Sequence, residues 1–200
     1  ECATDLMYLN IDNQIDAVCD IAPARPGAAS LVWQRGYQGV SRTNNMIFYT
    51  DRAVSEGYIN ENEAAPLYAE TAVLRSFYWY LLTSTFGDVP FYTERVTEEN
   101  RTKIVKLPRM SATEIRNFCI EELRKNLSAM PARRTYDSGT DYRVGRALGL
   151  MLGGRLCLWN KDWDGALEFF GQLETIYGDL SQYPLSDVPF SVKYSRESIW

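Results

Sequence analysis

The sequence predicts an all-α protein built from paired antiparallel helices, and three observations support this prediction. Apolar residues recur three and four positions apart through most of the chain, which is the period of one helix face. Prolines and glycines fall at the ends of these periodic segments and mark where helices stop. No segment with the period of a strand stands out over more than about four residues, so no ordinary strand is predicted.

The chain is predicted to start with a loop-rich segment at 1–30, because prolines and a glycine cluster at 22–27. A first helix is predicted over about 31–53, where one stripe of side chains recurs at helical spacing. The stripe comprises Trp33, Tyr37, Val40, Asn44 and Ile47. A buried amide without hydrogen-bond partners costs roughly 1–3 kcal/mol. Asn44 is therefore predicted to bond to the backbone of a neighbouring element, with contact to a ligand as the alternative.

A second helix is predicted over about 66–86. Glu61 begins a short acidic segment before it, and acidic side chains interact favourably with a helix N-terminus. Pro66 suits a first turn, where its missing N–H costs no hydrogen bond. Gly87 and Pro90 follow the last periodic residue and end the helix. The apolar face consists of Leu67, Leu74, Phe77, Tyr78, Leu81 and Leu82.

Residues 93–109 are predicted to form a polar connector whose basic side chains are solvated. Ser111 and Glu114 have the spacing of a capping box, in which each side chain bonds to the backbone amide of the other residue. A third helix is therefore predicted to begin after Ser111 and to end at Pro131. A loop is predicted to follow at 132–141, where serine, glycine and threonine cluster.

The last two helices are predicted at about 144–160 and 163–177, joined by a two-residue turn that makes them antiparallel. Gly145, Gly149 and Gly153 recur every four residues, and each interior glycine costs about 1 kcal/mol relative to alanine. They therefore predict the close approach of a neighbouring helix backbone. A tetratricopeptide-like spacing is carried by Asp162, Trp163, Ala166, Leu167 and Phe170. Beyond Gly178 the chain is predicted to be irregular.

Composition excludes several classes of function. The chain has no histidine, which removes most general-base, triad and zinc schemes. Its formal net charge of −5 lacks the basic footprint of a nucleic-acid-binding protein. No apolar run approaches the eighteen or so residues of a membrane span. Cys119 and Cys157 lie in apolar helical patterns and are predicted to be core residues, whereas a disulfide between Cys2 and Cys19 is left open.

Motifs for catalysis or metal binding are incomplete. Asn160, Asp162 and Asp164 begin like a calcium loop, but the position that needs a bidentate glutamate is Gly171. Acidic pairs fall on predicted polar faces or turns, so a carboxylate-based glycosidase is not supported. The sequence has no phosphate-binding glycine loop and no nucleophile elbow. We therefore expect no catalytic residue, metal or cofactor.

Aromatic residues are the positive feature, with 13 Tyr, 5 Trp and 8 Phe. Flat rings can stack on the apolar faces of pyranose sugars while nearby amides and arginines bond hydroxyl groups, so this composition suits carbohydrate binding. Five of the ring positions fit helix stripes and predict a core role, namely Trp33, Tyr37, Trp79, Trp159 and Trp163. Tyr136 and Tyr142 lie in or beside a loop. These two tyrosines and Trp33 are the candidate ligand-binding residues.

Several longer segments form a recognisable pattern. The early helix carries Trp33-x3-Tyr37-x2-Val40-x-Arg42-x-Asn44-x2-Ile47. The most specific segment is Ala69-Glu70-x-Ala72-x-Leu74-Arg75-x-Phe77-Tyr78-x-Tyr80-Leu81, followed by Phe86-Gly87-Asp88-Val89-Pro90-Phe91. The last hairpin and the closing Glu197-Ser198-Ile199-Trp200 continue it. From about residue 31 onward, the chain resembles the SusD/RagB family of outer-membrane nutrient-binding lipoproteins.

This resemblance implies a mostly helical fold of tetratricopeptide-like hairpins, arranged as an α-α superhelix, with a more irregular C-terminal part. It also implies a surface-exposed lipoprotein of the outer membrane that is not an enzyme. Such a protein captures a glycan, or in some members a peptide, and delivers it to a SusC-type TonB-dependent transporter. Family ligand residues vary widely, so none is transferred to this sequence.

The chain is expected to be a single N-terminal helical region of such a protein, truncated at both ends. It comprises a lead-in at 1–30, helices at 31–177 and the start of an irregular part at 178–200. Membrane association would come only through a lipid anchor outside this chain. The alternative hypothesis is a tetratricopeptide-like scaffold that binds other proteins.

Overall fold

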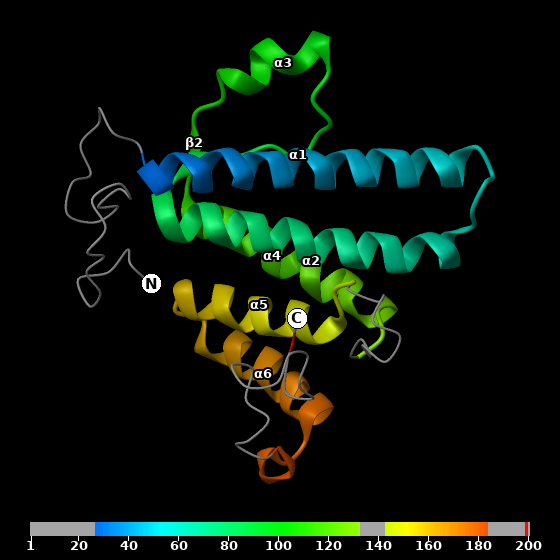
Figure 1. The fold of residues 1–200 in the computed structure, drawn as a ribbon, viewed down its shortest axis with the longest axis vertical. Coiled ribbons are helices and arrows are strands. Elements are labelled where there is room, and N and C mark those ends of the chain that lie inside the picture. Colours follow the sequence, from blue (N-terminus) through cyan, green and yellow to red (C-terminus); the bar gives the residue numbers. More distant parts are fainter. Residues whose placement is uncertain (1–26, 133–142, 184–198, 200) are drawn as a thin grey trace.

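The computed structural model describes residues 27–132, 143–183 and 199 of the chain. Within these residues the fold is helical, which confirms the predicted all-α class (Figure 1). The principal helices are α1 (Gly27–Ser55), α2 (Glu61–Phe86), α4 (Ala112–Asn126), α5 (Arg146–Trp159) and α6 (Trp163–Tyr177). The short elements are α3 (Glu98–Val105), β1 (Val89–Pro90), β2 (Arg109–Met110) and the 3-10 turns Leu127–Ala129 and Leu180–Gln182.

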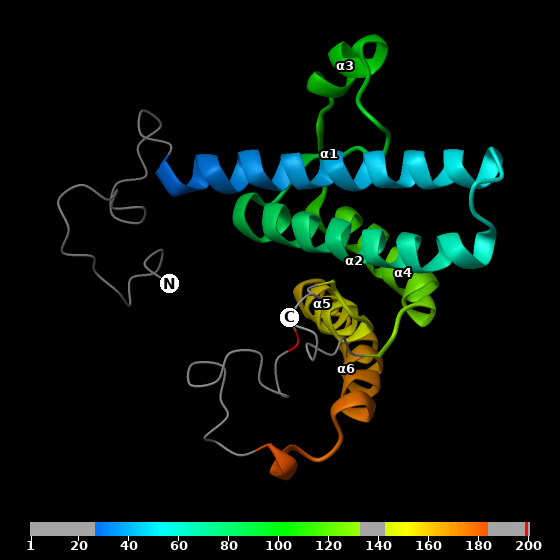
Figure 2. The same ribbon diagram turned by 45° about the vertical axis from the view of Figure 1, so that its right-hand side comes forward.

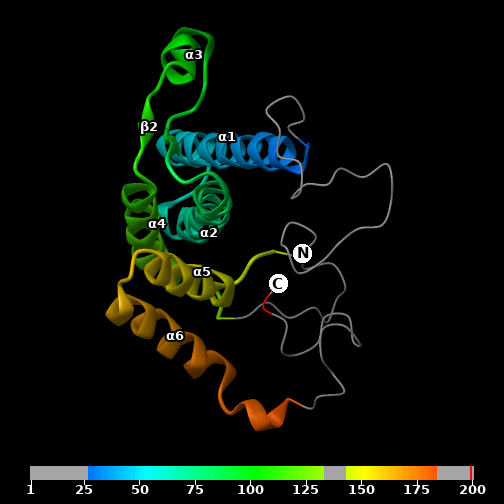
Figure 3. The same cartoon turned by 90° about the vertical axis from the view of Figure 1, so that its left-hand side faces the viewer.

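Each principal helix packs on the next one in the chain, from α1 on α2 to α5 on α6. Figure 3 shows these helices following one another from one end of the molecule to the other. Helix α2 is central, because it contacts α1, α4 and α5. Helix α3 stands apart on an arm beyond α1 (Figure 2), and β1 and β2 pair antiparallel at the base of this arm.

The first helix confirms the prediction for Asn44. Helix α1 is slightly longer than predicted at both ends, and Asn44 is fully buried on it. The Asn44 Nδ2 group donates to the backbone oxygens of Tyr92 at 3.4 Å and Glu94 at 3.2 Å. The amide therefore fixes the segment after β1 against α1.

The start of α2 differs from the prediction, because the helix begins at Glu61 and Pro66 lies inside it. Asn60 is the N-cap: its Oδ1 accepts from the amides of Asn62 at 2.9 Å and Glu63 at 3.1 Å. The Glu63 carboxylate accepts from the Asn60 amide at 2.9 Å and completes a capping box. These paired hydrogen bonds, rather than the proline, set the start. Gly87 ends the helix as predicted, with φ of +68°.

The predicted polar connector is wrong in part, because it contains α3. The Thr97 amide donates to Asn100 Oδ1 at 2.7 Å at the start of this helix. Ile104 is the only buried side chain of α3. A helix with one apolar contact has no apolar stripe to detect in the sequence. The basic residues of the arm are exposed as predicted, namely Arg101, Lys103, Lys106 and Arg109.

The predicted capping box at Ser111 is also wrong. Helix α4 does begin after Ser111, but within the described residues that side chain makes no capping hydrogen bond. Asp88, from the turn after α2, accepts from the Ala112 amide at 2.9 Å instead. An aspartate that caps a helix from a distant turn also ties the two helices together.

We expect Asp88→Ala to lower the free energy of unfolding by about 1 kcal/mol, because the first turn of α4 loses its acceptor. Ser111→Ala should change it by less than about 0.5 kcal/mol. Urea unfolding followed by circular dichroism measures both values. An equal loss in the two variants would indicate that Ser111 also caps α4 and would contradict Asp88 as its cap.

The last hairpin agrees closely with the prediction. Helix α6 covers the predicted residues, and Asp162 Oδ1 accepts from the Gly165 amide at its start at 3.0 Å.

The glycine stripe of α5 makes room for side chains rather than for a helix backbone. A Cβ at Gly149 would collide with Leu127, and one at Gly153 would collide with Phe169.

The core confirms the prediction for both cysteines, since Cys119 and Cys157 are fully buried. Burial raises the pKa of Cys119 to about 12 and the pKa of Cys157 to about 11, so both thiols stay protonated at neutral pH. Neither is therefore a reactive thiolate. The largest fully buried side chains around them are Trp79, Phe169, Leu82, Ile115, Leu123, Leu150 and Leu156.

Candidate functional site

An aromatic cluster lies where the start of α1 meets the end of α2. The Trp33 ring centroid is 4.8 Å from that of Tyr37 and 5.1 Å from that of Phe86, which it meets edge to face. Trp33 keeps 36% of its surface exposed. It is thus packed on one side and open on the other, so the predicted core role holds only in part. A partly exposed ring held by two others is a rigid platform for stacking.

Behind Trp33, the cluster is structural. Tyr37 donates its hydroxyl to the backbone oxygen of Pro90 at 2.7 Å, and burial raises its pKa above the ordinary value. Trp79 is fully buried, as predicted, between Tyr37, Phe91 and Tyr92. Among the described rings of this cluster, Trp33 is the most exposed.

The other two candidate ligand residues, Tyr136 and Tyr142, lie outside the described residues. The candidate set therefore stays a prediction. Two further rings were missed, since Phe48 and Tyr49 are exposed on α1. They hold the Arg95 guanidinium carbon 4.7 Å and 5.2 Å from their ring centroids.

The predicted core role is wrong for Trp159 and Trp163. Their exposed fractions are 51% and 61%. Both lie at the turn of the α5–α6 hairpin, whose inner side is filled by Cys157, Ala166 and Phe169. Helical spacing shows that side chains share a stripe, but it does not show which of two adjacent stripes faces the core. Trp159 instead packs under Arg116, whose guanidinium carbon is 4.9 Å from its ring centroid.

A groove of about 660 Å³ is bounded by one stripe from each of α1, α2 and α4. We call it the polar groove. Its lining consists of Ile47, Asp51, Val54, Glu61, Tyr68, Arg75, Thr93, Phe118, Glu122, Lys125 and Asn126. The volume lies in the range of roughly 300–1,000 Å³ that is typical of small-ligand sites. Three apolar side chains and a larger polar set share this lining.

Arg75 joins the three helices that form the polar groove. Its guanidinium forms an ion pair with Glu122 of α4 and donates to Asn44 Oδ1 of α1 at 3.4 Å. The Arg75 side chain is 6% exposed and that of Glu122 is 25% exposed, so this contact is largely removed from water. Breaking a buried ion pair by removing one partner is costly, which makes this contact a structural anchor.

A hydrogen bond joins α1 and α2 on another side of the polar groove. Tyr68 donates its hydroxyl to Asp51 Oδ1 at 2.6 Å. Burial and this hydrogen bond raise the pKa of Tyr68 to about 12, so the hydroxyl remains a donor at neutral pH. Asp51 itself is exposed. One of its oxygens is therefore engaged while the carboxylate still faces solvent.

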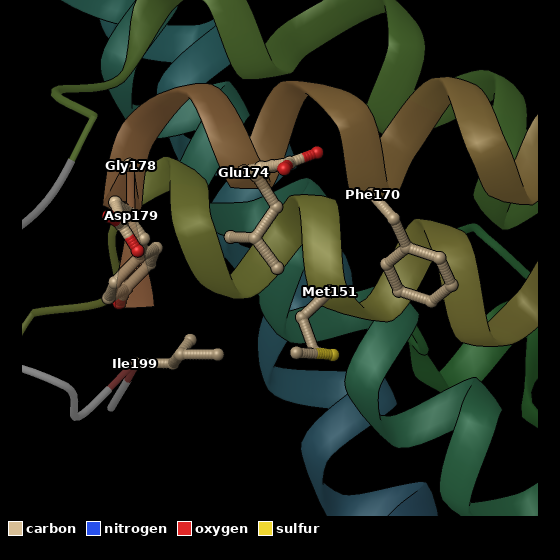
Figure 4. A pocket seen from close by; sticks show the side chains of 8 residues that line it. Met151, Phe170, Glu174, Gly178, Asp179 and Ile199 are labelled. Atoms are coloured by element: carbon tan, nitrogen blue, oxygen red, sulfur yellow. The ribbon is translucent and has the colours of Figure 1, made fainter. Parts of the chain in front are cut away.

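A second, apolar pocket of about 600 Å³ lies on the α5–α6 hairpin (Figure 4). Met151 extends into it from α5 and Phe170 from α6, and Ile199 lies beside them. Ile199 also packs against the main core. Tyr177, Glu174 and Asp179 add polar groups to this mostly apolar lining.

Metal binding finds no support in the part of the chain that the structure describes. No group of three or more Cys, Asp or Glu side chains there could hold a metal ion. The incomplete calcium motif at 160–165 forms the turn of the α5–α6 hairpin instead. Among the described helices, none is long and apolar enough to cross a membrane.

A known protein family matches this chain. The SusD-like family described as "starch-binding associating with outer membrane" matches residues 3–138. The match includes most of the lead-in at 1–30, which the resemblance in the sequence did not cover, and it ends before α5. Among proteins with curated functions, no relative matches significantly.

Solved structures share the fold. Surface glycan-binding protein A from Bacteroides uniformis has a TM-score of 0.70 at 23% identity, covering 87% of this chain. The same-named protein from Bacteroides thetaiotaomicron, solved with laminarihexaose, has a TM-score of 0.67 at 24% identity over 84% of this chain. A SusD superfamily protein from Bacteroides vulgatus scores 0.68 at 18% identity and 85% coverage.

This chain spans only part of those proteins. It covers 38%, 34% and 35% of their lengths, respectively. Their identity to this chain is low, so they establish the fold and not a shared ligand.

Proposed function

This chain belongs to the SusD-like family, and from that premise we propose that its protein binds glycans at the cell surface without converting them. The observation that carries the proposal is the family match, which covers residues 3–138 and thus α1 to α4. The solved relative that holds laminarihexaose supports the same class of ligand.

We propose further that the protein delivers its ligand to a SusC-type TonB-dependent transporter and is held at the outer membrane by a lipid anchor. These statements rest on the resemblance to the SusD/RagB family. The exposed side chains at the α5–α6 turn, Trp159 and Trp163, support a contact with another protein, because exposed aromatic residues are enriched at interfaces. A tetratricopeptide-like scaffold remains the alternative on the same observation.

For the ligand, we propose contacts from Trp33, Tyr136 and Tyr142. Trp33 is the one that the structure describes, and its partial exposure supports stacking on a sugar ring. Peptide binding is the other outcome that the resemblance allows. An oligopeptide therefore belongs in the same titration as the sugars.

We expect the full-length protein to bind laminarihexaose or maltohexaose in isothermal titration, and Trp33→Ala to weaken that binding at least tenfold. Removing a ring that anchors a ligand typically has an effect of this size. Trp33→Phe should retain most of the affinity, because it keeps a ring at the same place. Leu31→Ala is the matched control, because Leu31 is also exposed and lies two residues before Trp33 on α1.

An unchanged affinity in Trp33→Ala would remove this residue from the site. Tight binding of an oligopeptide, with no binding of either hexasaccharide, would replace the glycan in the proposal.

A further inference from the structure

The polar groove has a lining that no part of the proposed function uses. It is separate from the Trp33 platform, because Ile47 is fourteen residues further along α1 and the helix rises about 1.5 Å per residue, or about 21 Å in all. Trp33 and Ile47 belong to the same stripe of side chains on α1. The segment after β1 covers the middle of that stripe through its hydrogen bonds to Asn44, and the stripe opens again at the groove.

We propose that the polar groove is an oligosaccharide subsite for a neutral sugar, an inference that rests on the proposed function. The groove combines apolar surface from Phe118, Ile47 and Val54 with hydrogen-bonding groups from three helices. A sugar ring presents the same combination, with C–H faces and a rim of hydroxyl groups. A site of this kind binds by burying the faces and pairing the hydroxyls.

The hydrogen-bonding capacity is available in the described structure. Asp51 uses one oxygen for the Tyr68 hydroxyl, and a carboxylate can accept about four hydrogen bonds. Asn126 uses its Nδ2 group to donate to the Glu122 backbone oxygen at 2.8 Å, which leaves Oδ1 as an acceptor. Hydroxyl donors to a carboxylate form short, charge-assisted bonds. The groove is thus rich in acceptors for hydroxyl groups.

Charge selects against an acidic sugar. Three carboxylates line the groove, from Asp51, Glu61 and Glu122. Arg75 and Lys125 are the lining cations, and the Arg75 charge is already paired with Glu122. A uronate carboxylate entering the groove would meet the carboxylates of Asp51 and Glu61, with Lys125 as the one lining cation that is not already paired with Glu122. A neutral sugar avoids this repulsion.

The groove is also held in shape before any ligand enters. The Asn44–Arg75–Glu122 contacts fix α1, α2 and α4 relative to one another, and Tyr68 fixes Asp51. A ligand therefore does not have to order these side chains, which lowers the entropic cost of binding.

The test uses the full-length protein and whichever of laminarihexaose and maltohexaose it binds. We expect Asp51→Ala to raise the Kd at least tenfold, because a hydroxyl loses a charged acceptor. Asp51→Asn should recover part of the affinity, since it keeps an acceptor. Glu56→Ala is the matched control, because it also removes an exposed carboxylate with one partner near the end of α1, but outside the groove. It should leave the Kd within twofold.

Hydrogen exchange gives a readout that needs no variant. Bound hexasaccharide should slow amide exchange in 47–54 and 118–126, and trigalacturonate should bind at least tenfold more weakly than the neutral sugar. If the unaltered protein binds the sugar, but Asp51→Ala leaves the Kd unchanged and these segments show no protection, the groove is not a sugar subsite. The proposed function would still stand in that case. Preference for the uronate would also overturn it. Binding of no sugar at all would overturn both.

Discussion

Trp79→Ala is expected to lower the free energy of unfolding by about 3–5 kcal/mol, the largest effect that we predict for a single substitution. Trp79 is fully buried and its ring lies 4.9 Å from that of Phe91 and 5.9 Å from that of Tyr37. Removing it leaves a cavity where α2 meets α1 and the segment after β1. Denaturant unfolding followed by circular dichroism at 222 nm gives the value.

Trp163→Ala is the matched control, because it removes the same side chain from a position that is 61% exposed. We expect a change within about 0.5 kcal/mol. Comparable losses in the two variants would contradict the assignment of Trp79 to the core and Trp163 to the surface.

Glu122→Ala is expected to cost about 3 kcal/mol, because it leaves the Arg75 charge without its partner in a nearly dry site. Arg75 is 6% exposed, and of its hydrogen bonds to described residues only the one to Asn44 would remain. The adjacent residue supplies the control: Glu121 is 77% exposed and its ion pair with Arg124 is long, at 3.9 Å. Glu121→Ala should change stability by less than about 0.5 kcal/mol.

A double variant separates the ion pair from simple packing. Arg75→Met combined with Glu122→Met removes both charges, and such replacements of buried ion pairs are often close to neutral. We expect it to be more stable than Glu122→Ala in the same unfolding experiment. A double variant that is less stable than Glu122→Ala would show that the ion pair itself stabilises the fold.

Caps explain which helix bounds were predictable. The bounds of α6 were predicted correctly from the two-residue turn before it and from its helical spacing, and in the structure Asp162 caps its start and Gly178 follows its end. The start of α2 was missed because Pro66 suggested a first turn, while the Asn60–Glu63 hydrogen bonds begin the helix earlier. The start of α4 was placed correctly for the wrong reason. Its cap, Asp88, lies too far away in sequence for a local motif to reveal it.

The candidate site was predictable only in part. Trp33 was named as a ligand candidate although its spacing predicts a core role, and its place in a ligand site stays a prediction; its 36% exposure leaves one side of the ring open. The polar groove was missed, because its lining comes from three helices and each stripe alone resembles an ordinary solvated helix face. Arg75 gave no signal either. An arginine in an apolar helix reveals its role only when Asn44 and Glu122 lie beside it.

The family match supports glycan binding as the proposed function. Both described cysteines are buried thiols, and the sequence has no histidine. Aromatic and hydroxyl-bonding surfaces remain, at Trp33 and in the polar groove. Each can contact a sugar without breaking a bond, which agrees with a family described as starch-binding.

We propose that the full-length protein holds a neutral glycan and releases it unchanged. Titration with laminarihexaose and maltohexaose, followed by chromatography of the sugar recovered from the complex, tests this directly. We expect saturable binding of at least one hexasaccharide and its recovery at full length. Shortened sugar in the recovered fraction, or no binding of any neutral glycan, would contradict it.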